Sequence, residues 1–435
     1  MVSKKITPQG TSELIVWYAL IYTYPIYLLG GLYILAPVMG WILFALALYY
    51  WSTKGKCRSN GITAGTISYS VIVWLAAMLL MEIALIIGHA NFDLGIPKLI
   101  KSTIGWAKGW ALLAIFIFVG CVLPIREVVI YRACNIIGLQ TLLLTPFLII
   151  FFFIGLPGSL YISPLSVVGG PGPEFFEVQL YGINPESGQP RWRFFAPWAP
   201  AAGLLANIYF IFALQDASRI WKTFGIIAAI TICILCQSRA GFVVLLFTAP
   251  FLFFVKKLGN PYSLLWLAIL LTLLSVITEP LSDLLESGYE EFKSARTGSS
   301  RVRDALARIA LQRWSDEALI WGHGIVERGP HLVEYMPIGS HHTWYGLLFV
   351  KGIVGFISLA VALFITFTAL LLKLPTQPKA GVGIAMLIIL SLYALGENLE
   401  MLAYLFWPAL IIIGACSRPN NRSTKLSQFE ARSSR

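Results

Sequence analysis

The sequence predicts an all-helical membrane protein with several spans, and two observations support this. Of its 435 residues, 57% are hydrophobic and only 12% are charged, whereas soluble proteins carry about 25% charged residues. Many apolar runs also reach the ~20 residues that a helix needs to cross ~30 Å of hydrocarbon, which favours a helical bundle over a barrel. We therefore expect a single transmembrane domain over residues 1–435, in contact with membrane lipids.

About twelve apolar segments are the expected transmembrane helices. They lie at residues 14–31, 32–51, 64–88, 105–124, 136–157, 197–215, 223–238, 241–255, 262–279, 343–372, 380–397 and 400–416. Lysine and arginine mark every loop on the side of the N-terminus, which predicts that both termini are cytoplasmic. The net charge of +11 follows from this bias, so no nucleic acid is expected as a partner.

Two long segments are predicted on the opposite, outer side. The first, 158–196, is rich in glycine and proline and ends in Arg191-Trp192-Arg193. The second, 280–341, lies between spans nine and ten and contains an amphipathic pattern over 301–319, followed by an expected flexible turn at 321–324. Because a 60-residue loop is long for a connection, we expect the second segment to cap an active site.

Arginines on the outer side point to phosphate. Guanidinium offers a planar fork that binds phosphate bidentately and keeps its charge. Arg239 interrupts an apolar stretch between two spans, where an unpaired charge is costly, and Arg301 and Arg308 share a helix face. For Arg303 and Arg313 we expect structural roles.

The candidate catalytic groups cluster around His341 and His342. If the chain is helical from His341, then Tyr345, Leu348 and the glycines at 352 and 355 share its face, and the glycines let a neighbouring helix approach. Glu397 is expected either to orient a catalytic group or to cap a helix. The outer side shows no D-x-D or H-x-x-H pattern, so we expect a metal-free site without a cofactor.

These residues carry a family resemblance over about residues 190–416. The stretch from His341 to Gly355 resembles the His-Asn-x-x-Leu…Gly-x-x-Gly signature of the O-antigen ligase and polymerase superfamily, and Ser238-Arg239 resembles its Ser-Arg turn. The large outer loop is similar to the family's Arg…Trp-x-x-Ala-Leu…Gly-x-Gly run at Ser300-Arg301, Trp314, Ala318-Leu319 and Gly322-His323-Gly324.

Two family positions each have two candidates in this chain. His342 stands where the family has asparagine, and the eleven-residue spacing to Gly352 favours His341 over His342 as the family's histidine. Either Arg191 or Arg193 corresponds to the family's arginine before the sixth span.

The resemblance implies inverting glycosyl transfer from an undecaprenyl-pyrophosphate-linked glycan to lipid A-core, in lipopolysaccharide biosynthesis. The active site would face the periplasm from the inner membrane of a bacterium, with an architecture similar to GT-C glycosyltransferases. Arg191 or Arg193, Arg239, Arg301 and Arg308 would bind the pyrophosphate, Tyr345 would help orient the base, and His341 would take the proton of the acceptor hydroxyl.

Three alternatives remain at this point. An O-antigen polymerase and a protein O-oligosaccharyltransferase of the same superfamily would use the same donor with another acceptor. A polysaccharide or lipid transporter would use the outer arginines as a vestibule, but internal inverted repeats, which would favour it, are not evident.

Overall fold

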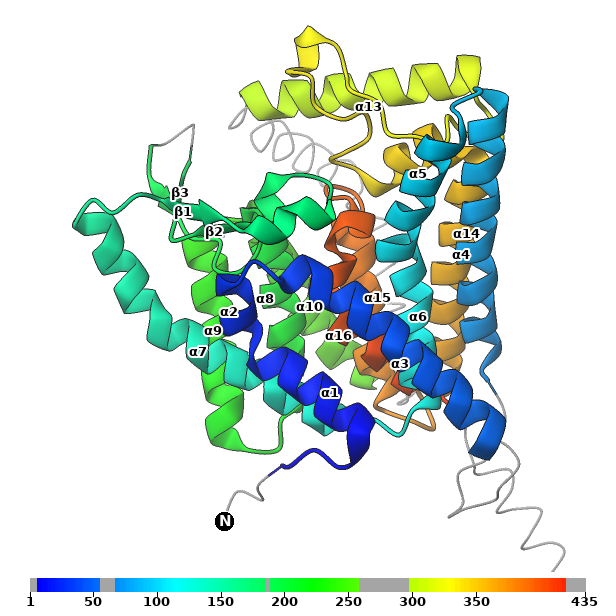
Figure 1. Ribbon diagram of the computed structural model, residues 1–435. Helices are drawn as coiled ribbons and strands as arrows, with labels where there is room; N and C mark the ends of the chain where they lie inside the picture. The colour runs from blue at the N-terminus through cyan, green and yellow to red at the C-terminus, as the bar shows by residue number, and fades with distance from the viewer. Residues whose placement is uncertain (1–5, 55–66, 185–187, 258–296, 420–435) are drawn as a thin grey trace, which may run out of the picture.

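A computed structural model describes residues 6–54, 67–184, 188–257 and 297–419. Within these residues the chain is mostly helical with little sheet (Figure 1). Seven helical segments of this part are apolar and long enough to cross a bilayer: Leu32–Thr53, Tyr69–Asn91, Ile96–Val122, Glu127–Phe153, Arg219–Cys236, Thr343–Lys373 and Leu399–Ser417. The prediction of an all-helical membrane protein is confirmed at this level.

The described helices fall into two length groups. The longer ones are α3 (Leu32–Lys54), α4 (Tyr69–Asn91), α7 (Glu127–Phe153), α9 (Arg219–Cys236), α10 (Arg239–Lys257), α13 (Thr297–Glu317), α14 (Thr343–Lys373) and α16 (Leu399–Ser417). The shorter ones are α1 (Gly10–Ile21), α2 (Thr23–Leu28), α5 (Ile96–Lys108), α6 (Trp110–Val122), α8 (Ala199–Gln215) and α15 (Ala380–Tyr393).

The predicted segment 158–196 holds the small amount of sheet. Strand β1 (Ser159–Ile162) pairs antiparallel with β2 (Glu177–Gln179), and β3 (Gly182–Ile183) pairs antiparallel with β4 (Pro190–Arg191). Two short 3₁₀ helices, η1 (Pro164–Val168) and η2 (Pro173–Phe175), lie between β1 and β2. A third, η3 (His331–Val333), lies in the second predicted loop.

The expected spans agree with these helices in most places and differ in two. The segment 262–279 lies outside the described residues, and each of the others overlaps at least one helix. The expected span 14–31 is two short helices that meet at Tyr22, and α1 covers only ~18 Å at 1.5 Å per residue. Residues 96–104, expected to be a loop, belong to α5, which continues into α6 after a break at Gly109.

The centre of the molecule is the pair α6 and α16. Almost every side chain of both helices is buried. The backbones come so close that a Cβ at Gly120 would lie 2.1 Å from the carbonyl oxygen of Ile411, and one at Gly414 would lie 2.0 Å from that of Ile117. Glycine at these two positions therefore permits van der Waals packing of backbone against backbone, as membrane helices use it.

Helix α14 differs in two places from the continuous helix that was expected from His341 through the glycines at 352 and 355. It begins at Thr343, so His341 precedes it, and it breaks at Gly352, which has φ 62° and ψ −163°. A neighbouring helix was expected to approach these glycines, but the neighbour at Gly352 is the segment after α13, residues 319–324. Its four backbone hydrogen bonds with α14 are His323 N–H to Phe349 O, Gly324 N–H to Val350 O, Ile353 N–H to Leu319 O and Val354 N–H to Ile320 O.

The second predicted loop is ordered where the structure describes it. Helix α13 lies across one end of the bundle, over the ends of α4, α5 and α14 (Figure 1). The expected flexible turn at 321–324 is instead held against the break in α14, because the peptide groups freed by Gly352 need partners that the segment supplies.

Candidate active site

A pocket of about 640 Å³ lies beneath α13, at the start of α14 and the end of α15. Polar and apolar side chains from all three places line it: Arg303, Asp304, Leu306, Ala307, Arg308, Leu311, Gly339, His341, His342, Tyr345, Leu395 and Gly396. Its size suits a substrate group. Helix α13 forms the cover of this pocket.

His342 is held in place as the N-cap of α14. The Tyr345 backbone N–H donates to its Nδ1 at 3.4 Å, and its ring stacks on that of Tyr345 with centroids 3.9 Å apart and planes 22° apart. Burial lowers the pKa of His342 to about 4, so the ring is neutral at pH 7. The lone pair of the neutral ring is thereby directed at the peptide N–H, which leaves the hydrogen on Nε2.

His341 lines the same pocket, but no backbone N–H of the described residues donates a hydrogen bond to its ring. Within the described part of the chain no hydrogen bond to its ring is found. Burial, and then the positive charge of Arg303, lower the pKa of His341 to about 4. A neutral imidazole with an available lone pair therefore borders the pocket, and it is the better placed of the two histidines to accept a proton.

Helix α13 brings two arginines to the pocket. Arg303, Ala307 and Leu311 recur every four residues, and Asp304 and Arg308 do the same beside them, so one broad face of the helix lines the cavity. Arg303 and Arg308 form no ion pair with any residue that the structure describes. Arg301, the predicted ligand, is exposed and lies outside the lining.

Glu397 lies in the turn between α15 and α16, behind the pocket. Its Oε2 accepts a hydrogen bond of 2.7 Å from Trp198 Nε1, and its side chain is 5% exposed. Burial raises the pKa of Glu397 to about 7, against the opposing charges of Arg303 and Arg191. The cap of α16 is Asn398 instead, whose Oδ1 accepts from the Glu400 N–H, so the helix-capping role considered for Glu397 belongs to its neighbour.

The turn that carries Glu397 is joined to the start of α14. The carbonyl oxygen of Glu397 accepts from both the N–H and the hydroxyl of Thr343, at 3.1 and 2.6 Å. The same hydroxyl accepts from the Leu399 N–H at 3.0 Å. The end of α15, the start of α16 and the histidines at the start of α14 are therefore positioned together.

The geometry separates Arg191 from Arg193. Arg191 donates from Nε to Cys236 O at 2.7 Å and from Nη2 to Gln237 O at 3.3 Å, so it satisfies carbonyls at the C-terminal end of α9, where positive charge is favoured. Arg193 donates to Pro197 O at 3.0 Å and packs against Gly182. Of the two, Arg191 is the one whose charge acts on Glu397.

Arg239 occupies the first position of α10. The preceding Ser238 is buried and its Oγ accepts from the Gly241 N–H at 3.1 Å, which caps the helix. Arg239 is exposed and does not line the pocket. Of the five predicted arginine ligands, the structure therefore places only Arg308 in the pocket, and it adds Arg303, for which a structural role was expected.

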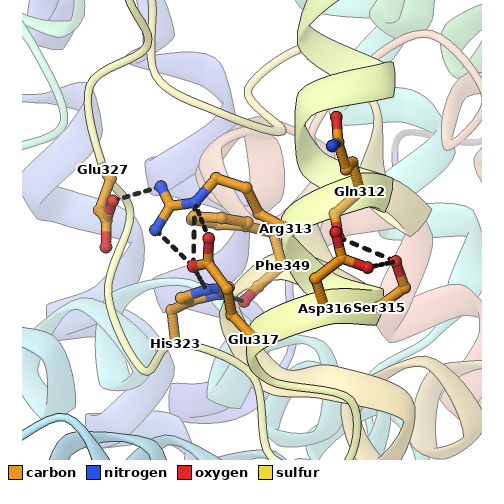
Figure 2. Close-up of polar contacts among 8 residues, drawn as sticks. All are labelled: Gln312, Arg313, Ser315, Asp316, Glu317, His323, Glu327 and Phe349. Atoms are coloured by element: carbon orange, nitrogen blue, oxygen red, sulfur yellow. Dashed lines mark hydrogen bonds and ion pairs between the residues drawn. The ribbon is translucent and has the colours of Figure 1, made fainter.

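The C-terminal end of α13 is anchored by a charged cluster, which we call the anchor: Arg313, Glu317, His323 and Glu327 (Figure 2). Arg313 donates to both oxygens of Glu317 and, at 2.6 Å, to Glu327 Oε2. His323 bridges Glu317 Oε2 at 2.8 Å and Phe349 O at 2.9 Å. The anchor joins α13 to the break in α14.

Aromatic rings enclose the buried member of the anchor. The His323 ring is 1% exposed and stacks between Phe349, at a centroid distance of 4.2 Å, and Phe92, at 5.0 Å. The Arg313 guanidinium lies 5.2 Å from the centroid of the Phe349 ring. His323, expected to be a loop residue and not a ligand, and Arg313, for which a structural role was expected, thus hold the cover of the pocket to α14 and to the end of α4.

Among the described residues, no three His, Cys, Asp or Glu side chains converge as possible ligands of a metal ion. The sequence matches no protein-family model, and no curated protein sequence is similar enough to count as a relative.

Proposed function

We propose that this protein is a membrane glycosyltransferase that moves a glycan from a polyprenyl-pyrophosphate carrier to a hydroxyl acceptor. The observation that carries the proposal is the pocket beneath α13. It combines two arginines with the neutral imidazole of His341, which forms no hydrogen bond with any described residue. The arginines suit a diphosphate, and the imidazole suits the removal of a proton from a hydroxyl. The helical, apolar body suits a donor that is itself a lipid.

The role of Arg303 and Arg308 is to stabilise the leaving group. As the bond between the anomeric carbon and the diphosphate oxygen breaks, its electron pair stays on the diphosphate, and negative charge grows there. Guanidinium groups positioned beforehand, in a partly dehydrated site, lower the energy of that state. Both side chains line the pocket from α13, five residues apart.

His341 is the base of the reaction. It takes the proton from the acceptor hydroxyl as the hydroxyl oxygen forms its bond to the anomeric carbon. With attack from the side opposite the diphosphate, the configuration at that carbon inverts and no covalent sugar intermediate forms.

Donor binding also makes His341 a stronger base. In the free protein the charge of Arg303 helps to lower the pKa of His341. A bound diphosphate neutralises that charge, so the pKa of His341 rises towards its ordinary value when the donor arrives.

Lipid A-core at the periplasmic face of a bacterial inner membrane is our proposed acceptor and location. A growing glycan chain, as for a polymerase, or a protein hydroxyl are the alternatives of the same reaction. Purified protein incubated with lipid-linked glycan, in separate reactions with lipid A-core and with an acceptor protein, distinguishes them. Glycan-capped core supports the ligase, longer lipid-linked glycan supports the polymerase, and glycan on the acceptor protein supports the protein transferase. No consumption of the donor in either reaction contradicts the proposal altogether.

Substitution of Arg303 tests whether this side chain binds the diphosphate of the donor. Arg303→Gln is expected to raise the donor KM at least about tenfold, because a charge-assisted hydrogen bond contributes about 1.5–3 kcal/mol. Arg303→Lys keeps the charge without the fork and is expected to recover only part of the loss. The matched control is Arg301→Gln, which removes the same charge from the same helix outside the pocket. Equal changes of the donor KM in Arg303→Gln and Arg301→Gln would contradict binding of the diphosphate by Arg303.

A further inference from the structure

Helix α5 carries a surface that the transfer reaction does not use. Its exposed residues include Ile96, Ile100 and Ile104, which are 72%, 55% and 49% exposed and recur every four residues along one stripe. Lys98 and Lys101 are exposed on the adjoining stripe, three residues apart. The helix contains no acidic residue, and no side chain of it is fully buried.

The lysines of this surface are not explained by topology. In the predicted orientation α5 lies on the outer side, at the end of the bundle that carries α13, where the charge bias of membrane proteins does not call for lysine. Within the residues that the structure describes, neither Lys98 nor Lys101 takes part in an ion pair. Lys108, lower on the helix, instead donates to Gly169 O at 3.4 Å.

The helix is fixed so that this surface faces outward. Trp106 Nε1 donates to Met78 O at 2.9 Å, and Thr103 donates to Glu82 at 2.6 Å, which ties the second half of α5 to α4. Trp41 Nε1 donates to Ala107 O at 3.1 Å. The isoleucines and the two lysines remain on the face that the bundle leaves uncovered.

We propose that α5 binds an anionic phospholipid, with Lys98 and Lys101 on the headgroup phosphate and the isoleucine stripe against the acyl chains. The two Cα atoms are one helical turn or less apart, about 4.5 Å along the axis, so both ammonium groups reach one phosphate. Lysine stems lie along apolar surface while their charges stay at the headgroup level.

A phospholipid is the one occupant that satisfies both stripes. Inorganic phosphate would leave three isoleucines exposed, and an acidic soluble protein would place polar surface against them. A phospholipid brings phosphate and hydrocarbon in the same molecule. The site is independent of the pocket beneath α13 and of the reaction proposed there.

The test uses the full-length protein in vesicles with a photoreactive phosphatidylglycerol, and labelling is measured on the peptide that contains residues 96–108. We expect labelling to exceed that by a photoreactive phosphatidylcholine and to fall with salt. Lys98→Gln with Lys101→Gln is expected to lower it more than tenfold, since each lysine near an anionic surface contributes about fivefold in affinity.

Two further variants make the result specific. Lys98→Arg with Lys101→Arg keeps the charge and is expected to retain the labelling. Arg328→Gln removes an exposed positive charge from the second predicted loop, outside α5, and is expected to leave labelling of α5 unchanged. Equal labelling by the two lipids, or unchanged labelling in the double glutamine variant, would overturn the proposal.

Discussion

At the scale of single residues, two adjacent histidines with similar burial receive different roles from their hydrogen bonds. His342 uses its lone pair on the Tyr345 N–H, while the lone pair of His341 has no such partner among the described residues. The sequence spacing favoured His341 and the geometry supports the same choice for a physical reason. Arg303 is the neighbour that adjusts the proposed base, because its charge lowers the pKa of His341.

The coupling between Arg303 and His341 predicts a pH dependence. The base must be neutral, so kcat/KM should fall on the acid side near the His341 pKa of about 4, and about nine-tenths of the plateau should remain at pH 5. Arg303→Gln removes the charge that lowers this pKa, so the acid limb should move to higher pH. Burial should still keep the pKa of His341 below its ordinary value of 6.5.

The measurement is kcat/KM for the donor between pH 3.5 and 8. Arg301→Gln, which changes the net charge equally outside the pocket, should keep the wild-type limb. An acid limb at the same pH in wild-type protein and in Arg303→Gln would show that Arg303 does not act on the base.

At the scale of elements, α13 depends on its anchor for its position over the pocket. Exposed ion pairs alone contribute only about 0.2–1 kcal/mol each. In the anchor, however, Glu317 also accepts from His323, which is buried, and the Arg313 and His323 contacts lower the pKa of Glu317 to about 2. Loss of Glu317 would leave a buried ring nitrogen without its acceptor, which costs more than an exposed pair.

Glu317→Ala is therefore expected to loosen α13 while the bundle stays folded. Amide hydrogen exchange in α13 should accelerate about tenfold or more, as for a local opening that has become easier, while exchange in α6 and α16 stays slow. The control is Asp316→Ala, because the neighbouring carboxylate accepts only from Ser315 among the described residues (Figure 2). If the two variants exchange alike, the anchor does not hold the helix.

At the scale of the whole molecule, local composition predicted most of the helices, because a run of apolar residues in a bilayer must be helical to satisfy its own peptide groups. Residues 96–104 of α5 were missed because Lys98 and Lys101 interrupt the apolar run. The break at Gly352 could not be foreseen either. Its stability comes from residues 319–324, and pairing of distant segments leaves no local pattern in either one.

The candidate site was predicted only in part, again because contacts between distant segments leave no local pattern in the sequence. Both histidines, Tyr345 and Arg308 were expected and do line one pocket. The choice of Arg303 over Arg301 depends on how α13 is rotated, and the anchor at its far end sets that rotation through contacts with α14 and α4. A sequence shows which helix carries arginines more readily than which face of the helix meets the pocket.

The central claim is that the pocket beneath α13 transfers glycan with His341 as its base. The most direct test compares His341→Ala and His342→Ala, both with thermal unfolding as a check on folding, in transfer from lipid-linked glycan to lipid A-core. His341→Ala is expected to lower kcat by about 10²–10⁴, the usual contribution of a general base, and His342→Ala is expected to keep measurable transfer. Full activity in folded His341→Ala, or loss confined to His342→Ala, would contradict that claim.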